Sequence, residues 1–291
     1  MRKEKDLIEL SVASKTNSPG ATEILKNIFL DLGCDSQNLI EYNQDGKQKV
    51  VTFFSSLTKS TQLQSRIKRL GLKNIEIQLT KLKRTDWQDK WKRDFVPFHL
   101  TKRLDIVPVW RKSGYRLSKN REPIYLDTIT AFGTGLHDTT RFMAQLIEHC
   151  RGGFERFLDI GTGTGILSLV AFKYRAKYIC AIDVDKECIA VARSNIHLNK
   201  SRLDHLEAVD LKDFKSEKSF DFVAANLITH DLIRLKRKIF SLVNPGKFLA
   251  ISGISTENTP RLKKEFQKLP LRCLKIYKSQ NWAAFLYKRI L

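Results

Sequence analysis

The first 85 residues alternate between strand-like and helix-like patterns. The run DLIELSVAS places apolar side chains at alternate positions, which is typical of a strand. A helical stretch ends at Gly33, and two strand-like runs then flank Asp45-Gly46, a hairpin signal. A second helix ends at Gly71, and the strand NIEIQLTKL follows. This β-α-β-β-α-β order predicts a ferredoxin-like domain, a pattern that by itself indicates no function.

An aromatic stripe follows the first domain. Trp87, Trp91 and Phe95 recur every four residues, which predicts a short amphipathic helix that ends at Pro97. These aromatic side chains either pack a connector onto one of the domains or form a hinge that docks a partner. The runs RLDIVPVW and PIYLDT are then expected to form short strands.

From Phe157 onward, strand and helix patterns alternate regularly. Such alternation predicts βα units and a mostly parallel sheet. The expected strands are ERFLDI, KYICAID, HLEAVD, FDFVAANL and KFLAISGI. The expected helices span Ile166–Tyr174, Lys186–Leu198 and Asp231–Leu242. A final hairpin, LRCLKIYKSQ with WAAFLYKR, adds two strands.

Glycines and acids gather at the ends of these strands. Residues 161–165 read GTGTG between a strand and a helix, so backbone N–H groups there can approach a ligand closely. Asp159 precedes this loop, and Asp183 ends the next strand, where a carboxylate can accept hydrogen bonds from both ribose hydroxyls. Asp210 is placed to face an adenine edge, and Asn226 ends the fourth strand. Each acid alone is also typical of a structural cap, but together they predict a nucleoside site at the carboxyl edge of the sheet.

A second glycine loop, AFGTGLHDTT, lies upstream and leads into the helix TTRFMAQLIEHC. Asp138 or Thr139 is expected to cap that helix, since both residue types favour the N-cap position. An ordinary loop with a cap is the alternative to a ligand-binding role for this segment.

The net charge of the chain says more about its possible partners than its length does. The 291 residues carry 52 Lys and Arg against 31 Asp and Glu, a formal charge of +21, and 42% are hydrophobic, enough for a packed core. Residues 91–125 hold 9 basic and 3 acidic side chains, a denser excess than in residues 1–90 or in residues 126–291. The charge indicates either a generic basic surface or one that approaches RNA or a ribonucleoprotein.

Other classes of protein are disfavoured by what the sequence lacks. Its five cysteines include no CxxC pair, which argues against a zinc ribbon or a disulfide framework, and we expect no metal site. The N-terminus has no signal-peptide pattern, and charges interrupt every apolar run before ~18 residues. We therefore expect a cytoplasmic protein that does not enter a membrane.

Several motifs together resemble one family. AFGTGLHDTT and LDIGTGTGILSL, followed in order by AIDVD and ANLI, resemble the bacterial ribosomal protein L11 methyltransferases, which are class I S-adenosylmethionine-dependent enzymes. The resemblance extends to WQDKWKRDFVPFHLTKRLDIVPVW, NPGKFLAISGI and WAAFLYKR, nearly the whole chain. It implies an α/β Rossmann-like methyltransferase sheet in residues 99–291, a small α+β ferredoxin-like domain for substrate recognition in residues 1–85, and a linker helix in residues 86–98.

The resemblance also implies roles for individual residues. Asn226 would lie beside the sulfonium and the incoming amine as the catalytic residue, and His137 would join a lid over the methionine part. His137 and His230 are candidate proton acceptors, although a structural role fits each of them as well. The residues expected to bind S-adenosyl-L-methionine are Phe132, Thr140, Gly161, Gly163, Asp183, Asp210 and Asn226.

The implied reaction transfers methyl groups to lysine side chains, to the N-terminal amine, or to both, on ribosomal protein L11, free or in the large subunit, with incidental rRNA contact. Two departures bear on substrate range: Thr128-Ile129-Thr130 replaces the family's Pro-Gly pair, and Asp138 replaces a common proline. The alternatives are methylation of another protein lysine, methylation of RNA, or cofactor binding without catalysis. Methyltransferases of planar amines usually carry a proline pair after the fourth strand, whereas this chain reads NLIT from Asn226 onward, which disfavours such substrates.

Overall fold

The chain divides into two compact units, Met1–Asp94 and Phe95–Leu291. The computed structural model describes residues 7–16, 21–32, 34, 39–44, 47–54, 56–82, 92, 95–127 and 134–290. Among these residues, every helix is too short or too polar to cross a bilayer.

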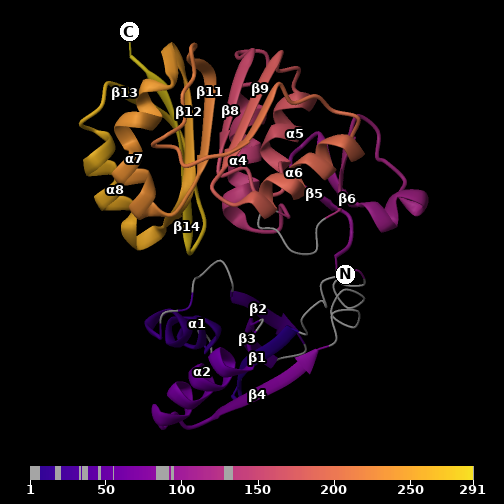
Figure 1. Cartoon of the computed structure of the whole chain (residues 1–291), viewed down its shortest axis with the longest axis vertical. Helices are drawn as coiled ribbons and strands as arrows, with labels where there is room; N and C mark the ends of the chain where they lie inside the picture. The colour runs from indigo at the N-terminus through magenta and orange to yellow at the C-terminus, as the bar shows by residue number, and fades with distance from the viewer. Residues whose placement is uncertain are drawn as a thin grey trace. The chain divides into compact units, whose positions relative to one another are not determined.

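The N-terminal unit has the β-α-β-β-α-β order predicted from its sequence (Figure 1). Its strands form one antiparallel sheet in the order β2-β3-β1-β4, the ferredoxin-like arrangement. Alternate residues of β1, Leu10 and Val12, pack against the apolar stripe of the two helices. The turn at Asp45-Gly46 and the helix end at Gly33 lie outside the described residues. The elements are β1 Leu7–Ser14, α1 Ala21–Asp31, β2 Leu39–Gln44, β3 Lys47–Phe54, α2 Leu57–Arg69 and β4 Ile75–Leu82.

Most of the predicted linker helix, including Trp87 and Trp91, also lies outside the described residues. Phe95 is described and is buried, with its ring centroid 6.1 Å from that of Phe98 and 6.0 Å from that of Trp110. The third aromatic residue of the stripe therefore packs within the C-terminal unit.

The C-terminal unit is built on a seven-stranded sheet in the order β10-β9-β8-β11-β12-β14-β13. The first five strands in this order are parallel, and β14 runs antiparallel between β12 and β13. This is the mostly parallel sheet that the alternating pattern predicted, and the C-terminal hairpin is confirmed as β13 and β14. The strands are β8 Arg156–Ile160, β9 Tyr178–Asp183, β10 His205–Ala208, β11 Phe220–Asn226, β12 Val243–Ser255, β13 Leu271–Lys278 and β14 Trp282–Arg289.

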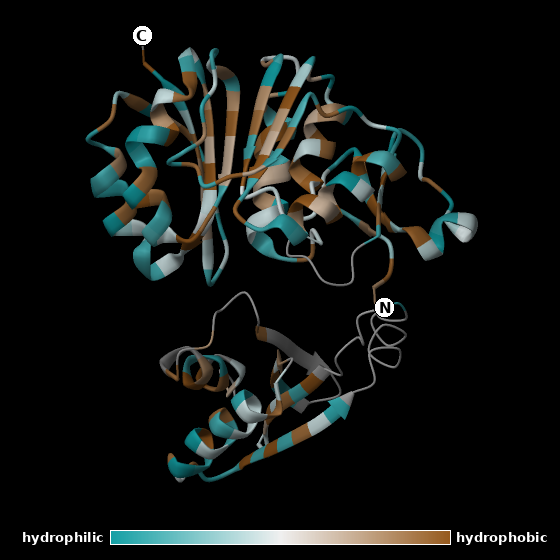
Figure 2. Ribbon diagram, viewed as in Figure 1, coloured by the Kyte–Doolittle hydropathy of each residue, from teal (hydrophilic) through white to brown (hydrophobic). Residues whose placement is uncertain are grey.

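Helices cover both faces of this sheet (Figure 1). One face carries α4 (Asp138–His149), α5 (Ile166–Lys173) and α6 (Lys186–Leu198), and the other carries α7 (Thr229–Ser241) and α8 (Thr259–Phe266). The apolar colouring is concentrated in the central strands, as Figure 2 shows. Because both faces are covered, these strands are continuous apolar runs, and Phe157, Phe222 and Phe285 are fully buried.

A separate three-stranded sheet precedes the large one in the chain. It contains β5 (Phe98–His99), β6 (Leu104–Pro108) and β7 (Glu122–Leu126), with β6 parallel to β7. The prediction that RLDIVPVW is one strand was wrong at its end, because β6 stops at Pro108 and Val109–Gly114 form a 3-10 helix. Proline has no N–H to continue the ladder, so the strand ends where the donor is missing.

Candidate functional site

The loop GTGTG joins the central strand β8 to α5. Gly161, Gly163 and Gly165 have φ values of +72°, +53° and +81°, a region that residues with a Cβ rarely adopt. The N–H groups of Gly161 and Thr162 donate to the Ile182 carbonyl at 2.9 and 3.1 Å. The loop is therefore tied to the end of the neighbouring strand β9.

Asp183 ends β9 and reinforces this connection. Its Oδ2 accepts a hydrogen bond from Gly163 N at 2.9 Å, and its Oδ1 accepts one from Asp185 N at 3.0 Å. Two of the predicted cofactor-binding residues, Gly163 and Asp183, thus contact each other directly. The carboxylate is held in a fixed orientation at the carboxyl edge of the sheet.

Asp159 lies beneath the loop and is fully buried. Its Oδ2 accepts hydrogen bonds from the Thr162 hydroxyl (2.8 Å), the Ser168 hydroxyl (2.8 Å) and Ser168 N (3.1 Å). Burial raises the pKa of Asp159 to about 6, although these hydrogen bonds oppose the rise. Asp159 therefore holds the loop in place through hydrogen bonds, and its carboxylate connects Thr162 of the loop with Ser168 of α5.

A cavity of about 120 Å³ opens at the carboxyl ends of β8, β9, β10 and β11. Gly161, Asp183 and Asp210, three of the predicted site residues, all line it. A hydrogen bond from Lys212 N (2.9 Å), helped by the charges of Lys212 and Arg234, lowers the pKa of Asp210. Carboxylates at this rim suit the neutral N–H and O–H donors of a nucleoside.

Apolar side chains and one cation complete the lining of the cavity. Val184 directly follows Asp183 and is 73% exposed, Leu211 follows Asp210, and Leu227 follows Asn226. None of these three residues was predicted from the sequence, although an apolar residue directly after a polar strand end is a signal that could have found them. Arg234 of α7 also lines the cavity and pairs with Asp231 at 2.9 Å.

Asn226 ends β11, and the next residue in the chain, Leu227, lines the cavity. A Cβ built on Gly161 would lie 3.5 Å from the Asn226 carbonyl oxygen and 2.8 Å from Leu227 Cδ2. A Cβ on Gly253 of β12 would lie 2.1 Å from the Leu227 carbonyl oxygen. Gly161 thus allows the β11–α7 turn to approach the loop, which brings the Asn226 backbone beside Gly161, and Gly253 allows the same turn to approach β12.

The start of α4 differs from the expectation. The predicted cap at Asp138 or Thr139 was wrong, because His137 is the N-cap and its Nδ1 accepts from Thr139 N at 3.4 Å. The His137 backbone is extended, so the helix begins one residue earlier than the usual capping preferences suggest. The His137 ring also meets the Trp282 ring edge-on at 4.9 Å, so the histidine has structural contacts on two sides.

Two further predicted residues are not part of the described cavity lining. Thr140 is buried in the first turn of α4, and within the described residues its hydroxyl has no hydrogen-bond partner. Phe132 and the departure at Thr128-Ile129-Thr130 lie outside the described residues. Among the residues that are described, no three His, Cys, Asp or Glu side chains gather as a metal site would require.

Comparison with known proteins connects this geometry to one family. The family model for ribosomal protein L11 methyltransferase (PrmA) matches residues 16–290. The ribosomal protein L11 methyltransferase of Geotalea daltonii is 34% identical over 210 residues, covering 68% of this chain and 66% of that protein, just under two thirds of its length. The Streptococcus pneumoniae protein of the same name is 32% identical over 259 residues, covering 80% and 81%.

A solved structure agrees with these sequence matches. The ribosomal protein L11 methylase from Lactobacillus delbrueckii subsp. bulgaricus superposes with a TM-score of 0.62 at 28% identity, covering 68% of this chain and all of that one. The class I methyltransferase fold expected from the sequence is therefore confirmed. Together with its glycine loop and the acids at the strand ends, these matches show that the chain belongs to the ribosomal protein L11 methyltransferase family.

Proposed function

We propose that this protein transfers methyl groups from S-adenosylmethionine to amino groups of ribosomal protein L11, on lysine side chains, on the N-terminal amine or on both. The observation that carries the proposal is the cavity at the carboxyl ends of four parallel strands, where Gly161, Asp183 and Asp210 meet. The acceptor, free or in the large ribosomal subunit, would place the enzyme in the cytoplasm.

The residues present fit S-adenosylmethionine. Gly161 lines the cavity without a side chain, the two carboxylates can accept from ribose hydroxyls and the adenine amine, and Val184, Leu211 and Leu227 offer apolar surface to the base. Within the described chain the buried Thr140 hydroxyl lacks a hydrogen-bond partner, which suits contact with a polar part of the cofactor. Gly163 would support the site indirectly by fixing Asp183, and Phe132 would contribute from the upstream loop.

The chemistry needs little from the protein beyond positioning. Bound S-adenosylmethionine supplies a methyl group already activated by its sulfonium. Holding the amine in line with that methyl can lower the barrier by ~7–11 kcal/mol. We assign the orientation of the amine to the Asn226 side-chain oxygen, which would accept an amine N–H and direct the nitrogen lone pair toward the methyl group.

The amine must be neutral to attack. A lysine with the reference pKa of ~10.4 is neutral in roughly one molecule in a thousand near pH 7.5. An apolar mouth, to which the half-exposed Ile228, two residues after Asn226, would contribute, favours the neutral form by desolvation. His137 is held by Thr139 and Trp282, so an exposed His230 or water is the better candidate to take the proton.

We assign recognition of L11 to the ferredoxin-like domain, residues 1–85 of the N-terminal unit, because the cavity and its supporting residues all lie in the C-terminal unit. Removal of residues 1–94 should leave the affinity for S-adenosylhomocysteine within about twofold while abolishing L11 methylation. Calorimetry measures the first quantity, and transfer of labelled methyl groups to purified L11 measures the second. Full activity of the truncated chain would refute the assignment.

The same assay separates the alternative acceptors. Undermethylated ribosomes and labelled S-adenosylmethionine are incubated with the full chain, and protein is then separated from RNA. Label in L11 supports the proposal. Label in another protein or in rRNA would assign the same site to a different acceptor, and cofactor binding without any transfer would reduce the protein to a binding module.

A further inference from the structure

The segment between β6 and β7 concentrates positive charge. Residues 109–121, VWRKSGYRLSKNR, contain five basic and no acidic side chains. They form the 3-10 helix Val109–Gly114 and the following turn, and Arg111, Lys112, Arg116 and Lys119 are all exposed. In Figure 1 this short magenta helical turn projects from the layered body of the C-terminal unit. We name residues 109–121 the basic segment.

A buried carboxylate anchors the basic segment. Asp105 of β6 is fully buried and accepts hydrogen bonds from Arg121 Nε at 2.6 Å and from the Tyr115 hydroxyl at 2.7 Å, while the His99 ring lies at 2.6 Å. Burial alone would raise the pKa of Asp105, but the hydrogen bonds from His99, Tyr115 and Arg121 lower it below its ordinary value. This ionised carboxylate is fully engaged, so it fixes the segment without neutralising its four exposed cations.

Three of these cations, Lys112, Arg116 and Lys119, form no ion pair with an acid among the described residues. Glu122, which follows the segment directly, has its carboxylate 3.4 Å from Lys173 Nζ. Lys112 lies over the Tyr125 ring at 4.6 Å, and Arg116 and Lys119 have no ion-pair partner among the described residues. An exposed group of like charges on a fixed scaffold is suited to an anionic partner.

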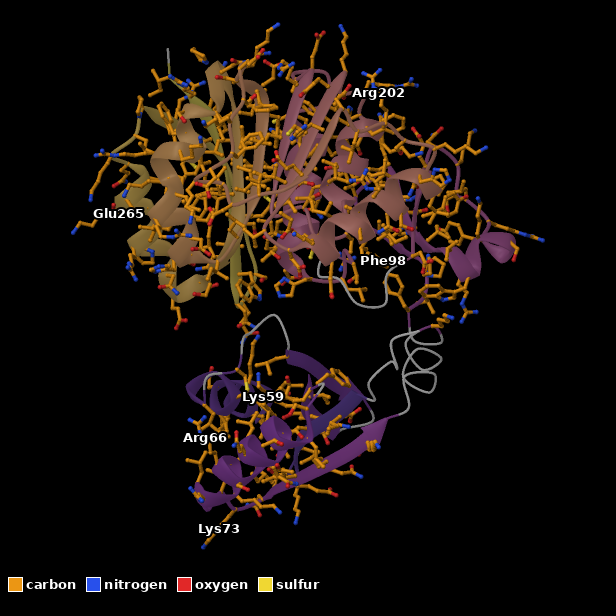
Figure 3. The ribbon with its side chains drawn as sticks, viewed as in Figure 1. Lys59, Arg66, Lys73, Phe98, Arg202 and Glu265 are labelled. Atoms are coloured by element: carbon orange, nitrogen blue, oxygen red, sulfur yellow. The ribbon has the colours of Figure 1, made fainter. Side chains whose placement is uncertain are left out.

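A recess with aromatic walls lies beside these cations. It has a volume of about 410 Å³ and is lined by residues 96–97, 110–111 and 113–115. Trp110 and Tyr115 supply the aromatic surface, and the buried Phe95 packs against Trp110 with a centroid distance of 6.0 Å. Phe98, labelled in Figure 3, marks the short sheet that carries this cluster. The volume is within the ~300–1,000 Å³ of small-molecule sites, enough for a single base.

We propose that the basic segment and this recess form a binding site for single-stranded RNA. Lys112, Arg116 and Lys119 contact phosphates, and an unpaired base enters the recess and stacks on Trp110 or Tyr115. Cations beside aromatic faces are the combination by which proteins hold single strands, whose bases are free to leave the stack. A duplex keeps its bases stacked and offers only phosphates, and an acidic peptide gains nothing from the aromatic recess.

This site lies outside the methyl-transfer cavity and shares no residue with its lining. The inference therefore goes beyond the proposed function and does not depend on it. It also gives a role to the dense positive charge of residues 91–125, which the methyl-transfer chemistry does not use. An enzyme with such a site would hold RNA beside its protein substrate without modifying it.

The test measures binding of a short fluorescein-labelled single-stranded RNA of mixed sequence to the full chain by fluorescence anisotropy. Arg116→Ala with Lys119→Ala removes two exposed cations, and Lys215→Ala with Lys218→Ala removes two exposed cations from the β10–β11 loop as a matched control. We expect the first pair to weaken binding about tenfold and to reduce the slope of log affinity against log salt by about 1.4, at ~0.7 per phosphate contact. The control pair should leave both nearly unchanged.

Trp110 is tested by two further variants. Trp110→Ala should weaken binding about tenfold through lost stacking, whereas Trp110→Phe, which keeps an aromatic face, should retain most of the affinity. Unchanged RNA affinity in the Arg116 and Lys119 variant, an equal loss in the control, equal affinity for a duplex, or equally strong competition by polyglutamate would each overturn the proposal. Methyl transfer to L11, assayed separately, reports on the proposed function alone.

Discussion

Replacing Gly161 by alanine should have two effects, one from strain in the backbone and one from contact with the Leu227 side chain. Gly161 has φ +72°, and a left-handed conformation costs a residue with a Cβ about 1–2 kcal/mol. The added Cβ would also lie 2.8 Å from Leu227 Cδ2, so the end of the leucine side chain must move, and Leu227 lines the cavity. We expect both a loss of stability and a weaker affinity for S-adenosylhomocysteine.

The stability loss can be expressed as a melting temperature. At ~2–4 °C per kcal/mol for a domain of this size, strain alone lowers Tm by about 2–8 °C. Displacement of Leu227 into the cavity should weaken binding about tenfold, equivalent to ~1.4 kcal/mol. Thermal unfolding followed by circular dichroism measures the first effect, and titration calorimetry with S-adenosylhomocysteine measures the second.

Gly152→Ala is the matched control. Gly152 has a similar φ of +78°, but its added Cβ would meet nothing within 4 Å. It should lower Tm by a similar amount and leave affinity unchanged. In Gly253→Ala, the Cβ would lie 2.1 Å from the Leu227 backbone carbonyl, which cannot rotate away, so this variant should be the least stable of the three. Equal affinity in the Gly161 and Gly152 variants would refute the reasoning.

Two other predictions concern Asn226 and Asp159. Asn226→Ala should lower the rate of methyl transfer about 100-fold while the affinity for S-adenosylhomocysteine stays within a few fold. Single-turnover kinetics measures the rate. Full activity of the variant would show that the side chain does not orient the amine. Because burial raises the pKa of Asp159 to about 6, the proton is held more tightly in the folded than in the unfolded chain. Its stabilising effect is therefore complete below pH ~4 and is lost as the pH rises through ~6, a change of about 3 kcal/mol. Urea unfolding across this range should show wild type losing that amount relative to Asp159→Asn, and a constant difference between the two would contradict the shift.

The sequence was most informative where chemistry is local. Alternating strand and helix patterns predicted both units, and the glycines at 161, 163 and 165 were placed correctly because a sharp turn with positive φ needs them. The chain order of polar strand ends also placed Asp183 and Asp210 at one cavity, since parallel strands share a carboxyl edge. The roles of Asn226, Thr140 and Phe132 stay predictions.

Features that depend on tertiary contacts could not be read in this way. Residue preferences favoured Asp138 or Thr139 as the cap of α4, whereas the backbone turns into the helix at His137, whose ring packs on the distant Trp282. The pattern of RLDIVPVW did not reveal that β6 joins a separate sheet or that the chain turns at Pro108. Val184 and Leu227 look like ordinary apolar residues until the sheet places them around one cavity.

The two edge strands of the seven-stranded sheet show a second role for part of the positive charge, which is to prevent pairing between molecules. An unpaired strand edge can template pairing with a second molecule, and natural proteins suppress this by keeping edge strands short or charged. One edge, β10, has only four residues, and the other, β13, carries Arg272, Lys275 and Lys278 around the exposed Leu274 and Ile276. The same basic side chains that raise the net charge therefore protect this protein from edge-to-edge aggregation, a protection that weakens as salt screens them.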